Sequence, residues 1–549
     1  MMEFLLRHIV VLPILIPMLA GAMMLFLAES RRGTRITLAL GSMIAQLAIG
    51  CVLLFLTSDS ASFIWQDGVG VYAIGNWMAP FGIVLVVDRL AAVMVTLGAI
   101  VSLTTMVYSI SRWDRPGQPF HSLFQLLTMG LNGAFLTGDL FNLFVFFEVL
   151  LAASYGLVLR GGGAARVKAG MHYIVVNLAA SLLFLVGVAL IYGMAGTLNM
   201  ADLSGRAAAL STADRALFDA GAAVLGVAFL IKAASWPLNF WLPGAYSLAS
   251  APVAAAFAMM TKVGLYAILR VGTILAADET LGAALFYLGL ATLVTGSVAM
   301  LGAKHLARLV AYSMLASMGI LLAALGLQHD SLTTPVMYYM IVSVLTSAAF
   351  FMLTGMTDRT RITDPPTDAG DEATDSTQPI YVAYGIKEPS VYRDDDEEVG
   401  IPIPATMAFL GLMFICCVLL VAGLPPLPGF VGKFAVLSAA VRAAPQMGGG
   451  PAVWLLCAAV LLSGLTAVIA LSRVGMRLFW GAARITPRLR VLEAAPVALL
   501  VLVCMGLSVW AGPVTQYLDS AARSLHQPDT YIRVVLAQRE GQPDTGRAP

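Results

Sequence analysis

Long apolar runs separated by short polar segments make up most of the chain between residues 11 and 510. Many of these runs reach ~20 residues, the length that a helix needs to cross a hydrocarbon core of ~30 Å. Windows of ~19 residues predict about fourteen spanning helices, so the pattern indicates an all-α polytopic membrane protein. The spans are expected at residues 9–28, 36–56, 81–110, 120–137, 140–159, 172–194, 220–241, 253–273, 281–301, 306–326, 333–355, 405–443, 451–471 and 493–512.

Two of these spans contain helix-breaking residues. The run 405–443 is too long for one crossing and includes GLPPLPG at 423–429, and the run 220–241 is interrupted at Trp236-Pro237. A bilayer tolerates a broken helix only where protein or water satisfies the freed backbone groups, and for this reason broken helices mark transport sites. Both spans are therefore predicted to be broken at membrane depth.

The basic residues predict an orientation. With fourteen helices, most Lys and Arg residues of the loops fall on one face, which the positive-inside rule makes cytoplasmic. Opposite loops such as 57–79 and 327–332 contain neither residue, while Arg206 and Arg215 are exceptions. Both termini are then expected on the periplasmic side of a bacterial inner membrane. The basic residues of the cytoplasmic face are Arg31, Arg32, Arg35, Arg112, Arg115, Arg160, Arg166, Lys168, Lys304, Arg308, Arg359, Arg361, Arg473, Arg477, Arg484, Arg488 and Arg490.

Composition excludes several other classes of protein. Of 549 residues 59% are hydrophobic and 11% are charged, so a soluble fold could not bury the apolar surface. The net charge of +1 and the lack of a basic arm argue against nucleic-acid binding. The five cysteines lie in apolar stretches without metal-binding spacing, and neither a dinucleotide fingerprint nor a P-loop occurs. No cofactor is expected, so an ion gradient or a partner must supply the driving force.

Three segments stand outside the regular spans. The run from Ile9 to Ala28 lacks a convincing cleavage site and is expected to be a retained first helix. Residues 357–401 form an acidic insertion, interpreted as a flexible cytoplasmic loop that is either a solvated linker or a docking segment. The tail after Pro513 is polar and contains no further span.

Four charged residues fall where the membrane interior is expected. They are Glu148, Lys232, Lys262 and, beside the second break, Lys433. An ionisable group at the bilayer centre costs about 2.5–3.5 kcal/mol on insertion scales, so such residues normally face a polar interior and are functional. The plain alternative is a static ion pair that holds helices together. Four such residues in one chain suggest a path for charge.

Lysine suits such a path because burial and a nearby carboxylate change its proton affinity in opposite directions. We expect Glu148 and Lys232 to form a switching pair, with Lys262 and Lys433 as relay stations. His172 and His305 are possible proton-entry residues near cytoplasmic helix ends, where capping is the alternative.

Two further acidic positions have simpler interpretations. Asp88-Arg89 lies at the outer end of its helix and is interpreted as an interfacial anchor, with transport as the alternative. Asp139 lies in a tight turn and is interpreted as a helix cap.

Several strings carry a family resemblance. Residues 113–157, the segment IKAASWPLNFWLP at 231–243 and the stretch 423–434 closely resemble the D-type member of the Mrp/Pha multisubunit Na+(K+)/H+ antiporters. The wider superfamily includes the antiporter-like subunits of respiratory complex I. The resemblance implies two inverted five-helix repeats with a broken helix in each, and it implies that Glu148 and Lys232 are the essential pair, with Lys262 and Lys433 at the other lysine positions.

This resemblance divides the chain into four parts. Residues 1–119 hold the first three helices, 120–275 and 276–480 are the two repeats, and 481–549 hold the last helix and the tail. Asn239 replaces the histidine usual in complex I homologues, residues 254–258 are apolar, and 338–353 lack a Lys or His. These departures favour a D-type antiporter subunit, and the lack of a long lateral helix argues against the larger A-type subunit.

Three functions remain open at this point. The leading one is a secondary transporter subunit, not an enzyme, that exchanges Na+ or K+ for protons within a complex of a homologous A-type subunit and small membrane subunits. The second is a proton-pumping membrane subunit of a redox enzyme, such as complex I or a membrane-bound hydrogenase. The third is a scaffold that does not transport ions.

Overall fold

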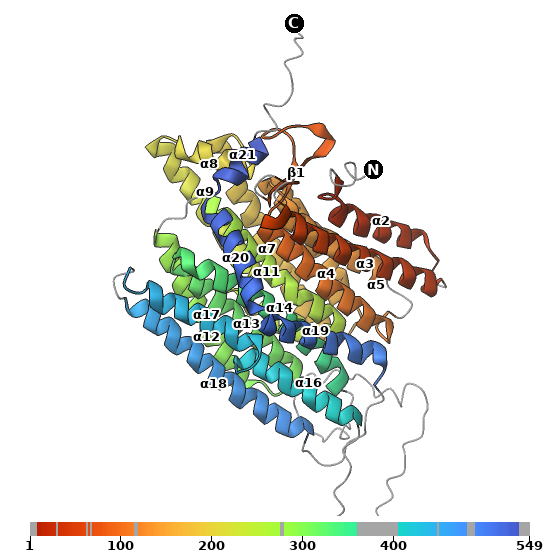
Figure 1. Cartoon of the computed structure of the whole chain (residues 1–549). Coiled ribbons are helices and arrows are strands. Elements are labelled where there is room, and N and C mark those ends of the chain that lie inside the picture. The colour runs from red at the N-terminus through yellow and green to blue at the C-terminus, as the bar shows by residue number, and fades with distance from the viewer. Residues whose placement is uncertain are drawn as a thin grey trace, which may run out of the picture.

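A computed structural model describes residues 8–28, 31–61, 64–65, 68–114, 119–274, 279–358, 405–446, 450–479 and 489–536. Within these residues, eleven helices are long and apolar enough to cross a membrane. The shorter α2 (Leu12–Phe26) and α5 (Phe120–Leu136) and the more charged α9 (Thr212–Lys232) pack beside them. The described chain thus forms a bundle of fourteen columns, where a column is one helix or one broken helix with both of its parts (Figure 1). The predicted all-α polytopic fold is confirmed, and eleven of the fourteen predicted spans are among the helices long enough to cross a membrane. Most of the predicted acidic insertion at 357–401 lies outside the described residues.

The first ten columns run from the N-terminus to the middle of the chain. They are α2 (Leu12–Phe26), α3 (Arg32–Leu56), α4 (Arg89–Ile110), α5 (Phe120–Leu136), α6 (Leu140–Val158), α7 (Ala164–Ala195), α9 (Thr212–Lys232) with α10 (Trp241–Leu248), α11 (Ala251–Ile274), α12 (Glu279–Gly302) and α13 (Leu306–Gly326).

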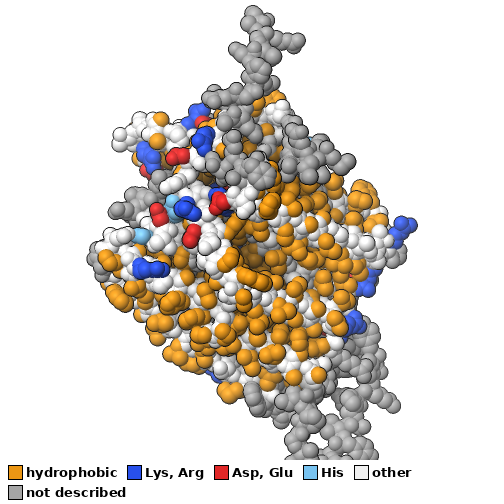
Figure 2. Space-filling model, viewed as in Figure 1, with side chains coloured by type: hydrophobic (Ala, Val, Ile, Leu, Met, Phe, Trp, Pro, Cys, Tyr) orange, Lys and Arg blue, Asp and Glu red, His pale blue; other side chains and the backbone are white. Residues whose placement is uncertain are grey.

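The last four columns complete the bundle. They are α14 (Thr333–Thr357), α16 (Ala405–Ala422) with α17 (Pro428–Ala443), α18 (Pro451–Phe479) and α19 (Val491–Val509). Helices α11 and α14 lie at the centre, where 94% of each spanning window is buried, whereas only 28% and 33% of the windows of α18 and α19 are buried. Figure 2 shows hydrophobic side chains covering the middle of the bundle surface and charged ones around its margins. That distribution fits a protein surrounded by lipid and other membrane proteins.

The first predicted break is confirmed between α9 and α10. Since residues 233–240 leave the helix, their backbone groups need other partners. The Trp236 N–H donates to Thr292 Oγ1 over 2.8 Å, and Asn239 Nδ2 donates to Thr295 Oγ1 over 3.2 Å. Thr292 and Thr295 are adjacent on α12, so one helix face supports this break.

The second predicted break is confirmed between α16 and α17. Gly423 has φ +76°, a left-handed conformation that favours glycine, and its N–H donates to the Leu419 carbonyl over 3.0 Å. Pro428 then opens α17, a position where its missing N–H removes no helical hydrogen bond.

The sequence missed a β-hairpin before the third long span. That span was expected from residue 81, but α4 begins at Arg89, and strands β1 (Gly70–Ala73) and β2 (Val84–Val87) pair antiparallel before it. Strand β2 is buried at all four positions, so its apolar run reads like part of a spanning helix.

The chain after the last span also folds into helices. Helix α20 (Ala511–His526) packs against α4 and α14, and α21 (Asp529–Leu536) packs against the short helix α8 (Met200–Ala208). Neither is a further span, in agreement with the prediction for the tail.

The bundle has two distinct ends. We call the end with the β-hairpin, α8 and α21 the hairpin end; residue 8 lies there as well, since His8 Nδ1 is 3.3 Å from Tyr72 Oη (Figure 1). The opposite end, which carries Arg32, Arg112, Arg160 and Arg308, is the arginine-rich end.

Candidate functional site

The four charged residues singled out in the sequence lie inside the bundle on four columns. Lys232 ends α9, Lys262 lies in the middle of α11, Lys433 lies one turn into α17, and Glu148 lies in the middle of α6. The three lysines are 5%, 0% and 7% exposed, respectively, and Glu148 is partly buried. Such burial requires a polar partner for each group.

Ser181 of α7 joins Glu148 to Lys232. The Ser181 hydroxyl donates a short hydrogen bond to Glu148 Oε1, and Lys232 Nζ lies 3.4 Å from Ser181 Oγ, within reach to donate to it. The Phe147 ring centroid lies 4.8 Å from the same ammonium. Among the described residues the two charged groups form no direct ion pair within 4.0 Å. A hydroxyl both donates and accepts, so this serine can connect the two groups.

The first break fixes the position of Lys232. This residue is the last of α9, so its positive charge lies at the negative end of the helix dipole. Helix α11 approaches closely there, because a Cβ at Gly264 would lie 2.8 Å from the Ala233 nitrogen. Glycine at this position therefore lets the end of α9 pack directly on the helix that carries Lys262.

Lys262 has a weak hydrogen-bond acceptor. Its Nζ lies 2.9 Å from Met318 Sδ of α13, and a thioether accepts hydrogen bonds poorly. No carboxylate lies within 4.0 Å of this ammonium in the described part of the chain. The amine thus has no fixed counter-charge.

Lys433 contacts backbone rather than side chains. Its Nζ donates to the carbonyls of Val421 and Ala422 at 2.8 and 3.1 Å, which are the last two carbonyls of α16. A Cβ at Gly423 would lie 2.6 Å from Lys433 Cδ, so the glycine also leaves room for the lysine stem. The second break therefore holds its cation on a helix C-terminus.

Of the two histidines considered for proton entry, His305 lies at a helix end as expected and His172 does not. Helix α7 begins at Ala164, so His172 lies two turns inside it with an exposed side chain and cannot cap its end. His305 holds the N-cap position of α13 but makes no side-chain capping hydrogen bond to that helix, and it is exposed. The α7 boundary was missed because Arg166 and Lys168 read as loop residues.

The predictions for the two acidic residues near the hairpin end differ in their outcome. Asp139 caps α6 as predicted, accepting from the N–H groups of Phe141 and Asn142 at 2.9 Å each. Burial raises the pKa of this carboxyl despite those hydrogen bonds. The interpretation of Asp88 as an interfacial anchor is wrong: it is buried and forms a bidentate ion pair with Arg270, at 2.6 and 2.7 Å. Arg270 was not predicted from the sequence.

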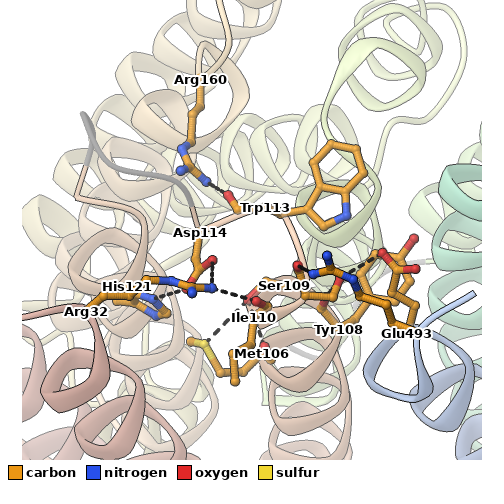
Figure 3. Close-up of polar contacts among 12 residues, drawn as sticks. Arg32, Met106, Tyr108, Ser109, Ile110, Trp113, Asp114, His121, Arg160 and Glu493 are labelled. Carbon is orange, nitrogen blue, oxygen red and sulfur yellow. Dashed lines mark hydrogen bonds and ion pairs between the residues drawn. The ribbon is translucent and has the colours of Figure 1, made fainter. Parts of the chain in front are cut away.

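A second polar network lies at the arginine-rich end (Figure 3). Asp114 accepts hydrogen bonds from Arg32 at 3.0 and 2.7 Å, and His121 Nε2 lies 3.4 Å from it. Burial would raise the pKa of the Asp114 carboxyl, but these hydrogen bonds and charges lower it below its usual value. The network links α3 to α5 and to the residues that follow α4.

The same network continues to α19. Glu493 is fully buried and accepts from the Ser111 hydroxyl at 2.8 Å, with Arg112 Nε 3.4 Å away. Arg490 donates to the Ser111 carbonyl over 2.6 Å. These contacts join the last spanning helix to the C-terminal end of α4, which indicates a structural role.

A cleft of about 300 Å³ opens beside the first break. Its lining combines polar and apolar groups from α10, α12, α13 and the break itself. Among the described residues no cluster of three or more His, Cys, Asp or Glu could hold a metal ion. The lining residues are Asn239, Phe240, Pro243, Gly244, Thr295, Ala299, Arg308, Tyr312 and Leu315.

The sequence matches known membrane proteins over almost its full length. Residues 137–367 match the transmembrane family model "NADH:quinone oxidoreductase/Mrp antiporter". The chain is 46% identical to the D-type component of a probable K(+)/H(+) antiporter of Rhizobium meliloti, covering 98% of this chain and 99% of that one. It is 32% identical to the D-type component of a Na(+)/H(+) antiporter of Bacillus subtilis, covering 97% and 100%.

Solved structures share the fold. A chain of the Mrp complex from Dietzia sp. superposes with a TM-score of 0.78 at 25% identity, covering 97% of this chain and 99% of that one. A chain of respiratory complex I from Thermus thermophilus superposes with a TM-score of 0.71 at 22% identity, covering 96% and 99%, and this likeness concerns the fold alone. The chain therefore belongs to the family of D-type subunits of the Mrp-type monovalent cation/proton antiporters.

Proposed function

We propose that this protein is the proton-translocating subunit of a multisubunit Na+ or K+/H+ antiporter and that Glu148, Lys232, Lys262 and Lys433 carry its protons. The observation that carries this proposal is the bridge Glu148–Ser181–Lys232 beside a broken helix. It places an acid and a base on the two sides of one hydroxyl. Full-length similarity to D-type subunits of two antiporters supports the same conclusion.

Proton transfer from Lys232 to Glu148 proceeds through two coupled steps at the Ser181 hydroxyl. The Lys232 ammonium gives a proton to Ser181 Oγ while the Ser181 hydroxyl gives its own proton to the Glu148 carboxylate. The charged pair becomes a neutral amine and a neutral carboxylic acid. A small approach of Lys232 shortens the 3.4 Å contact and favours transfer, and its withdrawal stops transfer. The pair thus acts as a switch that side-chain movement controls.

The remaining lysines extend the path through the centre of the bundle. Lys262 lies in the buried helix α11, against which the end of α9 packs, and its weak contact with Met318 leaves the amine free to exchange partners. Lys433 lies beyond α14, held by the end of α16. Protons pass from the first break toward the second along this row.

Access from the arginine-rich end is proposed through the cleft beside the first break. Asn239, Thr295 and Tyr312 supply polar groups along its wall, so water can approach the broken backbone. His172 and His305 are exposed toward the same end and are the proposed proton acceptors at that surface. The expected entry positions thereby stay part of the proposal.

The two broken helices also support the proposed repeats. Helices α5, α6, α7, α9–α10 and α11 make one set of five columns within 120–275, and α12, α13, α14, α16–α17 and α18 make the second within 276–480. In each set the fourth column is broken. Residues 1–119 and 481–549 then flank the two repeats.

Location and partners follow from the same features. The positive-inside rule makes the arginine-rich end cytoplasmic, so both termini are proposed to lie in the periplasm of a bacterium with the chain in its inner membrane. Other large and small antiporter subunits are the proposed partners, and large apolar side chains exposed on α7 and α18 offer surface for them.

The alternative, a pumping subunit of a redox complex, has less support. Chains of complex I and of an archaeal sulfane sulfur reductase share the fold at 22% identity each. The D-type antiporter proteins reach 46% and 32% over nearly the whole chain.

The proposal is tested in everted vesicles from an antiporter-deficient bacterium that expresses all subunits. Cation-dependent proton movement is compared for wild type, Glu148→Ala and Lys232→Ala, with assembly checked on native gels. Both variants should lose exchange by about a hundredfold or more, the range typical of a lost acid–base group. Lys168→Ala, an exposed lysine of α7, is the matched control. Full exchange in assembled Glu148→Ala and Lys232→Ala complexes would refute the proposal.

A further inference from the structure

A row of polar side chains leads from Lys262 toward the hairpin end and stops at a fixed ion pair. Lys262, Tyr266 and Arg270 are spaced four residues apart, so they share one face of α11. All three are buried. Such a row offers protons a second way out of Lys262, away from Lys433, unless something blocks it.

The Arg270–Asp88 pair commits both carboxylate oxygens to hydrogen bonds at the end of this row. Each guanidinium nitrogen Nη1 and Nη2 donates to one carboxylate oxygen, at 2.6 and 2.7 Å. Asp88 Oδ1 also accepts the Ala91 N–H at 2.9 Å as the N-cap of α4. Burial would raise the pKa of the Asp88 carboxyl, but the charge and hydrogen bonds of Arg270 hold it below its usual value. Both groups therefore stay charged and paired.

Tyr266 is also committed to a partner. Its hydroxyl donates to the Phe135 carbonyl over 2.7 Å, and Arg270 Nη2 approaches the same oxygen at 3.4 Å. An arginine keeps its proton at physiological pH. Consequently neither Tyr266, Arg270 nor Asp88 can readily accept a proton from Lys262 and pass it on.

The C-terminal helices cover this ion pair from the outside. The ring centroid of Tyr531 in α21 lies 5.5 Å from the Arg270 guanidinium carbon. Tyr531 and Val535 belong to a small apolar cluster with Val84 and Val86 of β2 and Ala201 of α8. Figure 1 shows α21 beside α8 and the hairpin at this end of the bundle.

Helix α20 holds the cover in place. Arg89, which follows Asp88, donates to Ser524 Oγ over 2.9 Å and pairs with Asp59 at 2.5 Å. The Tyr517 hydroxyl lies 2.6 Å from Thr57 Oγ1. The tail is thus anchored to the two connections that flank the hairpin.

We propose that Arg270, fixed by Asp88 and covered by Tyr531, is a positioning residue that seals the hairpin end of the proton path, so that protons on Lys262 continue only toward Lys433. The guanidinium keeps its own protons and accepts none, and with both Nη groups committed to Asp88 it ends the hydrogen-bonded row. The apolar cover keeps out water that could form a conducting chain. This inference rests on the proposed function, because it requires that Lys262 carries protons.

Passive proton entry into proteoliposomes that contain the complete complex, without added Na+ or K+, tests the seal. Asp88→Asn loosens Arg270 and Tyr531→Ala opens the cover. Each should raise the proton leak about tenfold or more, because one lost charge-assisted contact changes a barrier by at least a decade in rate. Adding Lys262→Ala to either variant should return the leak to that of wild type, which a merely structural defect would not do.

Arg206→Gln is the matched control, because Arg206 forms an exposed ion pair with Asp202 at the same end. The seal would be overturned if assembled Tyr531→Ala complexes leaked protons no faster than wild type. It would also be overturned if the raised leak remained after Lys262→Ala was added to Asp88→Asn or Tyr531→Ala. If Asp88→Asn does not assemble, Tyr531→Ala decides alone. Exchange by Glu148→Ala in the same vesicles is scored separately: its survival refutes the proposed function, whereas its loss together with a tight Tyr531→Ala complex refutes only the seal.

Discussion

The two broken helices hold their lysines in different ways. Lys232 lies next to the Ser181 hydroxyl, which donates a hydrogen bond to Glu148. Lys433 instead donates to the terminal carbonyls of α16. A carboxylate can gain or lose a proton, and a carbonyl dipole cannot. The first break therefore sets Lys232 beside a group that can take its proton, whereas the partners of Lys433 stabilise its charged form and cannot take its proton.

The breaks also differ in how their backbone groups are satisfied. At the first break, Thr292 of the neighbouring α12 accepts the Trp236 N–H, and Lys232 is not needed for this contact. At the second break, Lys433 itself satisfies the carbonyls of Val421 and Ala422. Replacing Lys232 should thus impair transport without impairing folding, whereas replacing Lys433 should impair both.

The largest expected effect concerns Lys433. Lys433→Ala should reduce exchange by about a hundredfold or more, as for a lost relay group, and should also weaken assembly because buried carbonyls lose their donor. Lys232→Ala should lose as much exchange and assemble normally. Vesicle exchange and native gels measure both. Normal assembly of Lys433→Ala would contradict the contrast between the breaks.

Thr292→Val tests the support of the first break. Valine has nearly the same shape but cannot accept a hydrogen bond from the Trp236 N–H. The free energy of unfolding should therefore fall by about 1–3 kcal/mol. Thermal unfolding of the complex in detergent measures the change. Thr295→Val is the control, since it loses only a side-chain contact with Asn239. Equal melting temperatures for Thr292→Val and wild type would exclude this support.

Gly423→Ala tests the second break. A left-handed conformation costs a non-glycine residue about 1–2 kcal/mol, and the new Cβ would lie 2.6 Å from Lys433 Cδ. The melting temperature and the exchange rate should both fall. Gly411→Ala in the preceding helix α16 is the control, because its Cβ would meet only Phe479 at 3.9 Å. If both alanine variants behave alike, Gly423 has no special role.

The smallest effect is expected outside both breaks. Asp114 has a lowered pKa in the folded chain, so its stabilisation is present above its ordinary value of 3.8 and is lost as pH falls through the lowered folded value. Asp114→Asn should therefore lower the free energy of unfolding by about 1 kcal/mol or less at pH 6 and at pH 8, since both values lie above 3.8 and its partner Arg32 is half exposed. Melting curves at both pH values measure it. If Asp114→Asn changed the exchange rate without changing the melting temperature, the Asp114 network would have a role in transport.

The sequence predicted most of the spans, both breaks and the four charged residues inside the bundle because each leaves a local signal. Apolar length, proline with glycine, and a charge within an apolar run are visible without knowing which helices meet. The strand β2 gave the wrong signal, because a short buried strand and a helical segment are both continuously apolar.

The contacts that give the charges their roles could not be predicted in the same way. Ser181 looks like any small polar residue of a spanning helix until α7 is placed beside α6 and α9. Arg270 lies near the end of its helix and reads as an interfacial residue, while its partner Asp88 is 182 positions away. Pairings over such distances depend on the packing of columns, which periodicity does not report.

The central claim is that Glu148 and Lys232 act as one unit through Ser181. A double-mutant cycle of exchange rates, with Glu148→Ala, Lys232→Ala and the double variant in assembled complexes, tests it most directly, and Ser181→Ala and Ser181→Thr show whether a hydroxyl is required. We expect the double variant to be no worse than either single one, Ser181→Ala to be impaired and Ser181→Thr to retain exchange. Additive losses, or unimpaired exchange in Ser181→Ala, would contradict it.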